Sequence, residues 1–404
     1  MANGMVIIGG GMAGARAVIG LRSGGWQGPI TLLSREALMP YDRPPLSKAA
    51  IAASEPPRPE FLLDEGIAAS LKAEVVLGRR ILAIDRAART VRMDDGHVSY
   101  DNLLIATGAA PRQLTCPGAH HALMLRDFPE ALELREHFQP GKTIAIIGGG
   151  FIGLELAASA AKRGCSVVVI EALPRILMRG VAEAIAAAVH ERHAAAGVRI
   201  MTGVGVGEIT SHAVILKDGQ SIAADTIIAG IGAVPETGLA ADAGLALDNG
   251  IAVDTHLRTS DPHIYAAGDC CSFPHPLFGN RRIRLESWRN AQDQGTLAGE
   301  NMAGADKTYA AVPWFWSDQY DLSLQIAGIP GDGSETVRRQ TGPHSFIIFH
   351  RDAGGRLVGV SGLGTGNSIA RDVKLSEMLI AKGINPAAEA LADPAITLKS
   401  LLKG

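Results

Sequence analysis

Two stretches of the chain follow the same plan, MVIIGGGMAG at Met5–Gly14 and TIAIIGGGFIG at Thr143–Gly153. In each, a short apolar run leads into a G-x-G-x-x-G turn, and an alanine-rich helical segment follows. A second apolar run comes next, at Ile30–Leu33 and at Ser166–Ile170 respectively. We therefore predict two βαβ units of the Rossmann type, far apart in one chain.

The glycines of each turn match the needs of a pyrophosphate. The first permits a tight turn, the second lets the backbone approach the phosphates, and the third lets helix and strand pack closely, while the helix N-terminus attracts the anion. These residues are Gly9, Gly11 and Gly14 in the first unit and Gly148, Gly150 and Gly153 in the second. One match is weak evidence, but two matches in this context predict two bound dinucleotides, FAD and a nicotinamide cofactor.

An acidic residue after the second strand of such a unit binds the ribose 2′-hydroxyl. Glu171 has this position in the second unit, which favours NADH over NADPH, although Arg175 and Arg179 lie close enough in sequence to accept a 2′-phosphate. In the first unit the position falls on Ser34–Glu36 (SRE). Glu36 is the only carboxylate within reach there, either as a ribose ligand or as a solvated loop charge.

The remaining segments indicate how the domains are arranged. The strand and turn at Leu103–Pro111 has a counterpart at Ile227–Pro235, and Ile264–Asp269 reads as a closing strand for the first unit. From about Trp314 the pattern changes to alternating apolar strands, at Leu324–Ala327, Phe346–Phe349 and Leu357–Val360, followed by a helix at Ile369–Lys382. We predict an α/β fold with two Rossmann-like dinucleotide-binding domains in a glutathione-reductase-like arrangement and a C-terminal α+β domain. The expected boundaries are 1–112 and 246–313 for the FAD-binding domain, 113–245 for the NAD-binding domain and 314–404 for the last.

Composition excludes several classes of function. The net charge of −3, from 38 basic and 41 acidic side chains, argues against a general nucleic-acid binder. No apolar run is long enough to cross a bilayer, and the N-terminus lacks the pattern of a signal peptide. The four cysteines form no C-x-x-C pair and no zinc-like cluster with histidine. We expect a cytoplasmic protein with no metal, no disulfide, and no nucleic-acid or membrane partner.

Six longer segments together resemble a known family. They are YDRPPLSK at Tyr41–Lys48, IATGAAPR at Ile105–Arg112, GGGFIGLELAA at Gly148–Ala158, YAAGD at Tyr265–Asp269, ESWRNAQDQG at Glu286–Gly295 and PWFWSDQYD at Pro313–Asp321. This combination resembles the NADH-dependent ferredoxin reductases of bacterial oxygenase systems, the family of the putidaredoxin and biphenyl dioxygenase reductases. The resemblance extends from the first strand to the C-terminal domain.

The resemblance implies an activity and a set of catalytic residues. A hydride passes from the nicotinamide C4 of NADH to the flavin N5 of FAD, so that stacked orientation matters more than an acid–base residue. Single electrons then pass to an acidic [2Fe–2S] ferredoxin, which feeds an oxygenase such as a cytochrome P450 or a Rieske dioxygenase. By the same resemblance Lys48 lies beside the flavin ring, Glu155 lies near it and the nicotinamide, and Trp316 lies on the flavin side.

The resemblance also implies the cofactor-binding residues. Arg43 and Arg126 are expected at the FAD phosphates or adenosine end, Asp269 at the ribityl chain, and Trp288 either near the isoalloxazine or in the core. Relatives commonly carry aspartate at the position of Arg35. The expected cofactor-binding set is Gly9, Gly11, Ala13, Gly14, Arg35, Glu36, Arg43, Lys48, Ile81, Ala106, Thr107, Gly108, Arg126, Gly148, Gly150, Ile152, Gly153, Glu171, Arg179, Gly232, Asp269, Glu286 and Trp288.

Other flavoproteins share the two glycine turns. A flavin disulfide reductase, or a thiol-dependent NADH oxidase or peroxidase, needs a redox cysteine after the first βαβ unit, where Arg43–Lys48 (RPPLSK) has none. An NADH-dependent rubredoxin or monodehydroascorbate reductase, and an NADH-sensing protein like apoptosis-inducing factor, are the remaining alternatives. A cluster of arginines comprises Arg281, Arg282, Arg284 and Arg289. It is either a docking site for an acidic ferredoxin or a solvated loop.

Overall fold

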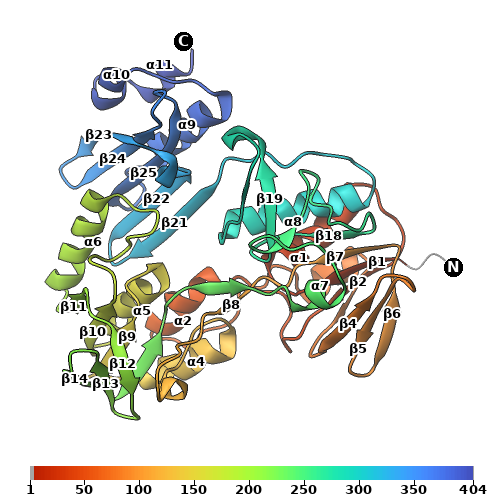
Figure 1. The fold of residues 1–404 in the computed structure, drawn as a ribbon, viewed down its shortest axis with the longest axis horizontal. Coiled ribbons are helices and arrows are strands. Elements are labelled where there is room, and N and C mark those ends of the chain that lie inside the picture. Colours follow the sequence, from red (N-terminus) through yellow and green to blue (C-terminus); the bar gives the residue numbers. More distant parts are fainter. Residues whose placement is uncertain (1–3, 404) are drawn as a thin grey trace. The chain divides into compact units, whose positions relative to one another are not determined.

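The computed structural model describes residues 4–403. The chain forms two compact units. Unit 1 contains residues 4–42, 59–110 and 234–311, and unit 2 contains residues 43–58, 111–233 and 312–403. Figure 1 labels the helices and strands of both units.

The core of unit 1 is a five-stranded parallel sheet with the order β18-β7-β1-β2-β3. The strands are β1 (Met5–Ile8), β2 (Ile30–Leu33), β3 (Ala73–Val76), β7 (Asn102–Ile105) and β18 (Ile264–Ala266). The sequence MVII of β1 carries no polar side chain, and in NLLI of β7 only Asn102 at the strand's start is polar, which is typical of a parallel sheet covered on both sides. Because β18 pairs with β7, the expectation that Ile264–Asp269 closes the first unit is confirmed.

Helix α1 (Met12–Ser23), which begins at the first glycine turn, packs against α8 (Trp288–Met302), as Figure 1 shows. Glycines allow the two helices to approach closely. A Cβ atom on Gly295 would overlap the carbonyl oxygen of Ala13, and one on Gly299 would overlap that of Ala17. Gly295, at the end of the ESWRNAQDQG segment, and Gly299 therefore allow α8 to pack closely on α1.

The rest of unit 1 is made of small elements. Two three-stranded sheets occur, β4 (Ile81–Asp85), β5 (Thr90–Met93) and β6 (Gly96–Ser99), and β17 (Ile251–Ala252), β19 (Cys271–His275) and β20 (Arg281–Ile283). The short helices are α3 (Glu65–Ser70), α7 (Gly238–Asp242) and η3 (Pro276–Phe278).

Unit 2 contains the second parallel sheet, with the order β11-β10-β9-β15. Its strands are β9 (Thr143–Ile147), β10 (Ser166–Glu171), β11 (Arg199–Thr202) and β15 (Thr226–Ala229). Helices α5 (Phe151–Lys162) and α6 (Glu183–Ala195) provide the crossovers, and β12 (Val206–Ile209), β13 (Ala213–Leu216) and β14 (Ser221–Ala223) form an antiparallel ribbon. Both predicted βαβ units are confirmed, within one residue at each strand.

Residues 43–58 group with unit 2. They form two short helices, η1 (Pro44–Ser47) and α2 (Ala49–Ala52), and η1 begins at a proline, which fits the first helical position. Arg135 of α4 (Phe128–His137) holds this segment by donating to several carbonyl oxygens, of residues 50, 51, 53, 54 and 55. Arg163 donates to the carbonyl of Ile51 as well.

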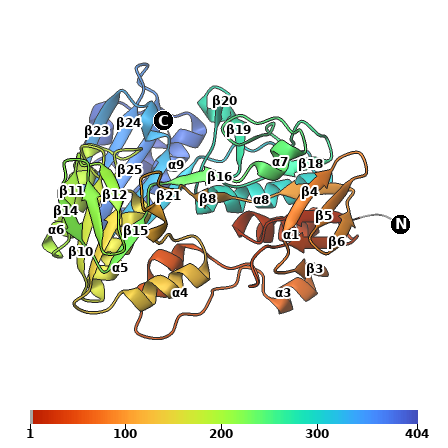
Figure 2. The same cartoon turned by 60° about the horizontal axis from the view of Figure 1, so that its bottom comes forward.

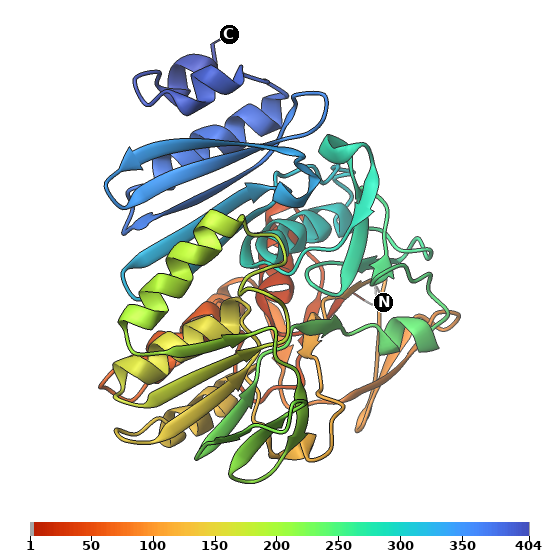
Figure 3. The same cartoon turned by 60° about the vertical axis from the view of Figure 1, so that its left-hand side comes forward.

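The C-terminal part of unit 2 is a five-stranded antiparallel sheet with the order β21-β22-β25-β24-β23. The strands are β21 (Trp314–Gln319), β22 (Leu322–Gly328), β23 (Glu335–Gly342), β24 (Ser345–Arg351) and β25 (Leu357–Thr365). Side chains alternate along β24, so that Phe346 and Ile348 pack with α6, whereas Ile347 faces the side of α9 (Ala370–Lys382). Figure 3 shows the sheet between these two helices, with α10 (Ala388–Ala392) and α11 (Leu398–Leu401) beyond α9.

Two short strands, β8 (Ala109–Pro111) and β16 (Ala233–Pro235), pair where the chain passes between the units, as Figure 2 shows. No helix within residues 4–403 is long and apolar enough to span a membrane. The predicted α/β class, with two dinucleotide-binding folds and a C-terminal α+β domain, is confirmed.

Candidate functional site

The glycine turn of unit 1 has the shape that a pyrophosphate needs. Gly9 has φ +120°, and a Cβ atom there would overlap the carbonyl oxygen of Ala106; one on Gly14 would overlap that of Gly9 itself. At Gly11 a Cβ atom would meet nothing within 4 Å, so this side of the turn is open. No side chain caps the first turn of α1, which leaves its N–H groups for a ligand.

A second part of unit 1 offers polar groups without partners. The amide oxygen of Gln294 accepts a hydrogen bond from the N–H of Gly268 (2.8 Å), next to Asp269. The guanidinium of Arg284 contacts the Asp269 carbonyl (3.3 Å) and the Glu286 carboxylate (2.6 Å). Among the described residues, Gln294 Nε2 and Arg284 Nε are buried without a hydrogen-bond partner. Buried polar atoms are nearly always paired, so these donors fit a bound cofactor.

The other residues expected in unit 1 have identifiable surroundings. Glu36 accepts a hydrogen bond from the Tyr41 hydroxyl (2.5 Å), and Arg35 is exposed. Trp288, the first residue of α8, donates its indole N–H to Asp42 (2.6 Å). The Thr107 hydroxyl donates to the carbonyl of Glu236 (2.6 Å). Four further residues are backbone or packing positions: Gly108 has φ +70°, Ala13 and Ala106 are buried beside the glycine turn, and Ile81 begins β4.

The glycine turn of unit 2 repeats the geometry of the first. A Cβ atom on Gly148 would overlap the carbonyl oxygen of Gly230, one on Gly153 would overlap that of Gly148, and Gly150 is open. Ile152, in the first turn of α5, keeps 47% of its surface exposed. Glu171 lies at the end of β10 and accepts hydrogen bonds from the N–H groups of Gly149 and Leu173, both at 2.7 Å. Its carboxylate is therefore held beside the turn.

The two arginines after Glu171 differ in their surroundings. Arg175 donates to the carbonyl oxygens of Ile176 and Leu177 (3.2 Å each) and of Val181 (2.9 Å). These bonds engage its guanidinium within its own loop, where the sequence had suggested a phosphate ligand. Arg179 is exposed. Gly232, further along the chain, has φ +105° and accepts a backbone hydrogen bond from Arg112.

A buried ion pair joins the PPLSK segment to α5. Lys48 Nζ lies 2.7 Å from Glu155 Oε2, and the side-chain exposures are 26% and 3%. Ser47 donates to the same oxygen (2.5 Å), and Ser317 of β21 donates to Oε1 (2.6 Å). Sequence reasoning found the pair but missed both serines, although both lie inside the motif segments that were recognised.

Three more of the expected residues lie in unit 2: Arg43, Arg126 and Trp316. Arg43 donates from Nη1 to the carbonyl oxygen of Arg126 (2.5 Å). Trp316 stacks on Trp314, with ring centroids 5.2 Å apart and 23° between the planes. Both tryptophans lie on β21, where Trp314 pairs with Ala327 of β22 and Trp316 pairs with Gln325.

Known proteins share this architecture. Residues 4–295 match the model of the family described as pyridine nucleotide-disulphide oxidoreductase, and residues 314–402 match the reductase C-terminal domain. The chain belongs to the pyridine nucleotide-disulphide oxidoreductase family. It is 38% identical to the ferredoxin–NAD(+) reductase component of an anthranilate 1,2-dioxygenase system from Burkholderia cepacia, over 98% of both chains.

Two other relatives bear on the choice of acceptor. A rubredoxin–NAD(+) reductase from Pseudomonas putida is 38% identical, over 82% of this chain and 88% of that one. The reductase in the crystal structure of a covalent putidaredoxin reductase–putidaredoxin complex is 33% identical, with a TM-score of 0.93 and coverage of 100% and 99%.

The disulphide in the family's description has no counterpart in the described residues. All four cysteines are free thiols: Cys116, Cys165, Cys270 and Cys271. Burial raises the pKa of the Cys270 thiol, and burial followed by the neighbouring Cys270 raises that of Cys271. A raised pKa keeps both in the unreactive thiol form. Among residues 4–403, no group of His, Cys, Asp and Glu is arranged to hold a metal ion.

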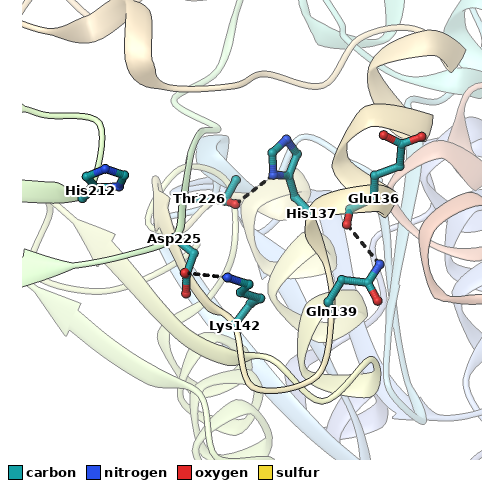
Figure 4. Close-up of a pocket in the computed structure, with 7 residues that line it drawn as sticks. All are labelled: Glu136, His137, Gln139, Lys142, His212, Asp225 and Thr226. Carbon is teal, nitrogen blue, oxygen red and sulfur yellow. Dashed lines mark hydrogen bonds and ion pairs between the residues drawn. The ribbon is translucent and has the colours of Figure 1, made fainter.

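A separate pocket of about 320 Å³ lies elsewhere in unit 2 (Figure 4). Lys142, Asp225 and Thr226 line it at the amino ends of β9 and β15, whereas Gly148 follows the carboxyl end of β9. Its side chains bind one another, since Lys142 pairs with Asp225 (3.0 Å) and Thr226 with His137 (3.3 Å). Open α/β sheets bind ligands at the carboxyl ends of their strands, and this pocket lies at the opposite end of the sheet.

Proposed function

We propose that the protein is an FAD-dependent NADH:ferredoxin oxidoreductase that supplies electrons to an oxygenase. The observation that carries this proposal is the ion pair between Glu155 and Lys48 of the PPLSK segment. A thiol-dependent relative needs a cysteine in that segment, and this chain has none there. A chain that binds both dinucleotides and lacks a redox thiol must pass its electrons to an external acceptor. The similarity to the reductase component of a dioxygenase system supports a ferredoxin as that acceptor.

Within this proposal, FAD belongs to the glycine turn of unit 1 and NADH to that of unit 2. The bound flavin accepts a hydride from NADH and releases the electrons one at a time. Lys48 places a positive charge beside the flavin, Glu155 fixes the direction of that ammonium group, and Trp316 offers an aromatic face. Arg43 and Arg126 hold the FAD phosphates or adenosine end, and Asp269 and Glu286 contribute on the side of Gln294 and Arg284.

Glu171 supports NADH as the donor. Its fixed carboxylate suits a ribose 2′-hydroxyl and repels a 2′-phosphate, while Arg175 is engaged by backbone carbonyls. Arg179 remains as the exposed cation of this loop. The division into an FAD-binding domain (1–112 and 246–313), an NAD-binding domain (113–245) and a C-terminal domain (314–404) is part of the same proposal. So is a cytoplasmic location, which suits a consumer of NADH with four free thiols.

The arginine cluster supports docking of an acidic ferredoxin, but with fewer of its arginines than the sequence indicated. Arg282 donates to the carbonyls of Val253 (3.0 Å) and Ser272 (2.6 Å), and Arg284 is paired with Glu286. Both therefore have structural roles in unit 1. Arg281 is exposed, so Arg281→Glu is the sharper test of docking. It should raise the KM for ferredoxin and its salt dependence, and leave ferricyanide reduction unchanged.

Rubredoxin is the second candidate acceptor, because a rubredoxin reductase is as similar in sequence as the dioxygenase component. The test uses the purified yellow protein with NADH or NADPH, and cytochrome c as the final acceptor. Addition of a [2Fe–2S] ferredoxin should accelerate cytochrome c reduction, and addition of a rubredoxin should accelerate it much less. Rapid reduction of peroxide or of a disulfide without either carrier would overturn the proposal.

A further inference from the structure

The polar contacts of Glu155 continue into the C-terminal sheet and helix α6. Ser317, which donates to Glu155 Oε1, accepts a hydrogen bond from Gln319 Nε2 (3.2 Å). Gln319 Oε1 in turn lies 2.8 Å from His193 Nε2. Ser317 and Gln319 are two residues apart on β21 and so share one face of the strand. Each of these four side chains is at most 3% exposed.

The chemistry of the donors fixes the direction of this chain. An ionised carboxylate can only accept, so Ser317 donates to Glu155, and the Ser317 oxygen is left to accept from the NH₂ of Gln319. The amide oxygen of Gln319 therefore faces His193, which has to donate from Nε2. Every hydrogen atom along the chain thus points toward Glu155, whose other oxygen receives Ser47 and Lys48.

The state of His193 agrees with this direction. Burial lowers the pKa of His193, the hydrogen bond with Gln319 opposes that effect, and Arg192 and His190 lower it further. A neutral imidazole has one N–H group, and here it is the one on Nε2. The hydroxyl of Tyr320 lies 3.4 Å from Nδ1 and can donate to it.

The chain does not conduct protons. A carboxamide cannot accept a proton on its oxygen and release one from its nitrogen near neutral pH, so Gln319 interrupts any relay between His193 and Ser317. What such a chain can do is orient its members, because each link pairs a buried donor with a buried acceptor. Around it, α6 and the facing sheet contribute apolar side chains such as Ile185, Val189 and Leu324.

We propose that Ser317, Gln319 and His193 are positioning residues that hold the Glu155 carboxylate with one oxygen turned to Lys48. The inference rests on the proposed function only in assigning the Lys48–Glu155 pair to the reaction between NADH and flavin. It gives the C-terminal domain a part in hydride transfer, through β21, and gives α6 a part through His193.

The competing explanation is that the chain only stabilises the packing of β21 on α6. A matched pair elsewhere in the same sheet separates the two explanations. His350 of β24 lies 3.1 Å from Ser361 of β25, both are at most 5% exposed, and no hydrogen bond described connects them to Glu155. Removing either histidine should destabilise the sheet, but only His193 should affect the ion pair.

The first measurement is the tautomer of His193 in the wild-type holoenzyme, from the ¹⁵N shifts of labelled histidine in NMR. We expect a neutral ring protonated on Nε2. A ring protonated on Nδ1, or a charged ring at neutral pH, would overturn the inference without any variant having to fold. This measurement involves no electron acceptor, so it stays decisive even if the proposed ferredoxin activity is wrong.

The second measurement is the rate of flavin bleaching by NADH in stopped flow. His193→Phe removes the donor and should slow hydride transfer roughly 10- to 100-fold, with the affinity for NADH little changed. His193→Gln retains an N–H donor and should restore most of the rate, whereas His350→Phe should lower stability and leave the rate within about twofold. Equal rates in the wild type and His193→Phe, or no rescue by His193→Gln, would sink the proposal.

Discussion

The carboxylate of Glu171 receives the backbone N–H of Gly149 at 2.7 Å, which fixes a negative charge at the rim of the second glycine turn. Glu171→Gln keeps an acceptor for that N–H and removes the charge. The ratio of kcat/KM for NADPH to that for NADH should rise about tenfold, equivalent to ~1.4 kcal/mol. Glu183→Gln, an exposed position in the first turn of α6, is the control and should leave the ratio unchanged. A constant ratio in the Glu171 variant would assign nicotinamide selectivity elsewhere, with Arg179 the next residue to test.

Stability should distinguish the Lys48–Glu155 ion pair from a surface pair. Lys48→Met leaves a carboxylate that is 3% exposed with serine donors alone, and we expect a loss of about 3 kcal/mol in the free energy of unfolding. Lys142→Met breaks the pair of Lys142 with Asp225, whose side chains are 53% and 43% exposed, and should lower the free energy of unfolding far less than Lys48→Met does. Urea titration of the flavin-saturated proteins measures both. Equal losses would mean that the buried pair contributes no more than an ordinary surface contact.

The close contact between α1 and α8 should not tolerate a methyl group. Gly299→Ala would place a Cβ atom against the backbone of Ala17, which cannot move aside as a flexible side chain could. The free energy of unfolding should fall by about 1–3 kcal/mol, and the variant should lose bound FAD. Gly238→Ala is the matched control, because its Cβ atom meets nothing within 4 Å and alanine favours helix α7. The measurement is the thermal midpoint and the flavin content after dialysis. Full FAD retention in Gly299→Ala would show that the helices can separate without loss of the site.

Acid should destabilise the C-terminal sheet through His350. Burial lowers its pKa from the ordinary 6.5 to about 4, so below about pH 6.5 the unfolded chain binds a proton that the folded chain does not. Stability therefore falls as the pH decreases from about 6.5 to about 4 and changes no further below that from this group, a total of roughly 3 kcal/mol. Unfolding by urea at several pH values should show this slope reduced in His350→Gln. His344→Gln, at an exposed position in the turn between β23 and β24, should retain the wild-type slope.

Sequence patterns identified the parts of the fold that depend on local chemistry. Apolar runs before glycine turns gave β1 and β9, and the position of Ile264–Asp269 followed from its apolar character and the chain order. Strands β21 and β23 were not predicted as such. In β21 the tryptophans Trp314 and Trp316 hide the alternation of apolar and polar residues. In β23 two adjacent arginines, Arg338 and Arg339, do not look like part of a strand. Arg339 is nevertheless buried and donates hydrogen bonds to three carbonyl oxygens.

The site was predictable only where a motif carries its own signal. Lys48 and Glu155 came from two recognised segments, but nothing local shows that Ser317, more than 160 residues after Glu155, completes its hydrogen bonding. The same is true of Arg175, whose charge suggested a phosphate ligand until the fold of its loop engaged it with carbonyl oxygens. Whether such a residue belongs to the site depends on long-range contacts and on the folding of single loops. The periodicity of the sequence carries no information about either.

Arg135 of helix α4 donates hydrogen bonds to five carbonyl oxygens of the segment that follows Lys48. The segment lies between two stretches of unit 1 in the chain, yet it belongs to unit 2, as Glu155 does. Lys48 and Glu155 therefore belong to the same compact unit, although the chain passes through unit 1 between them. Their ion pair is an internal contact of unit 2, so its geometry is set by the folding of that unit.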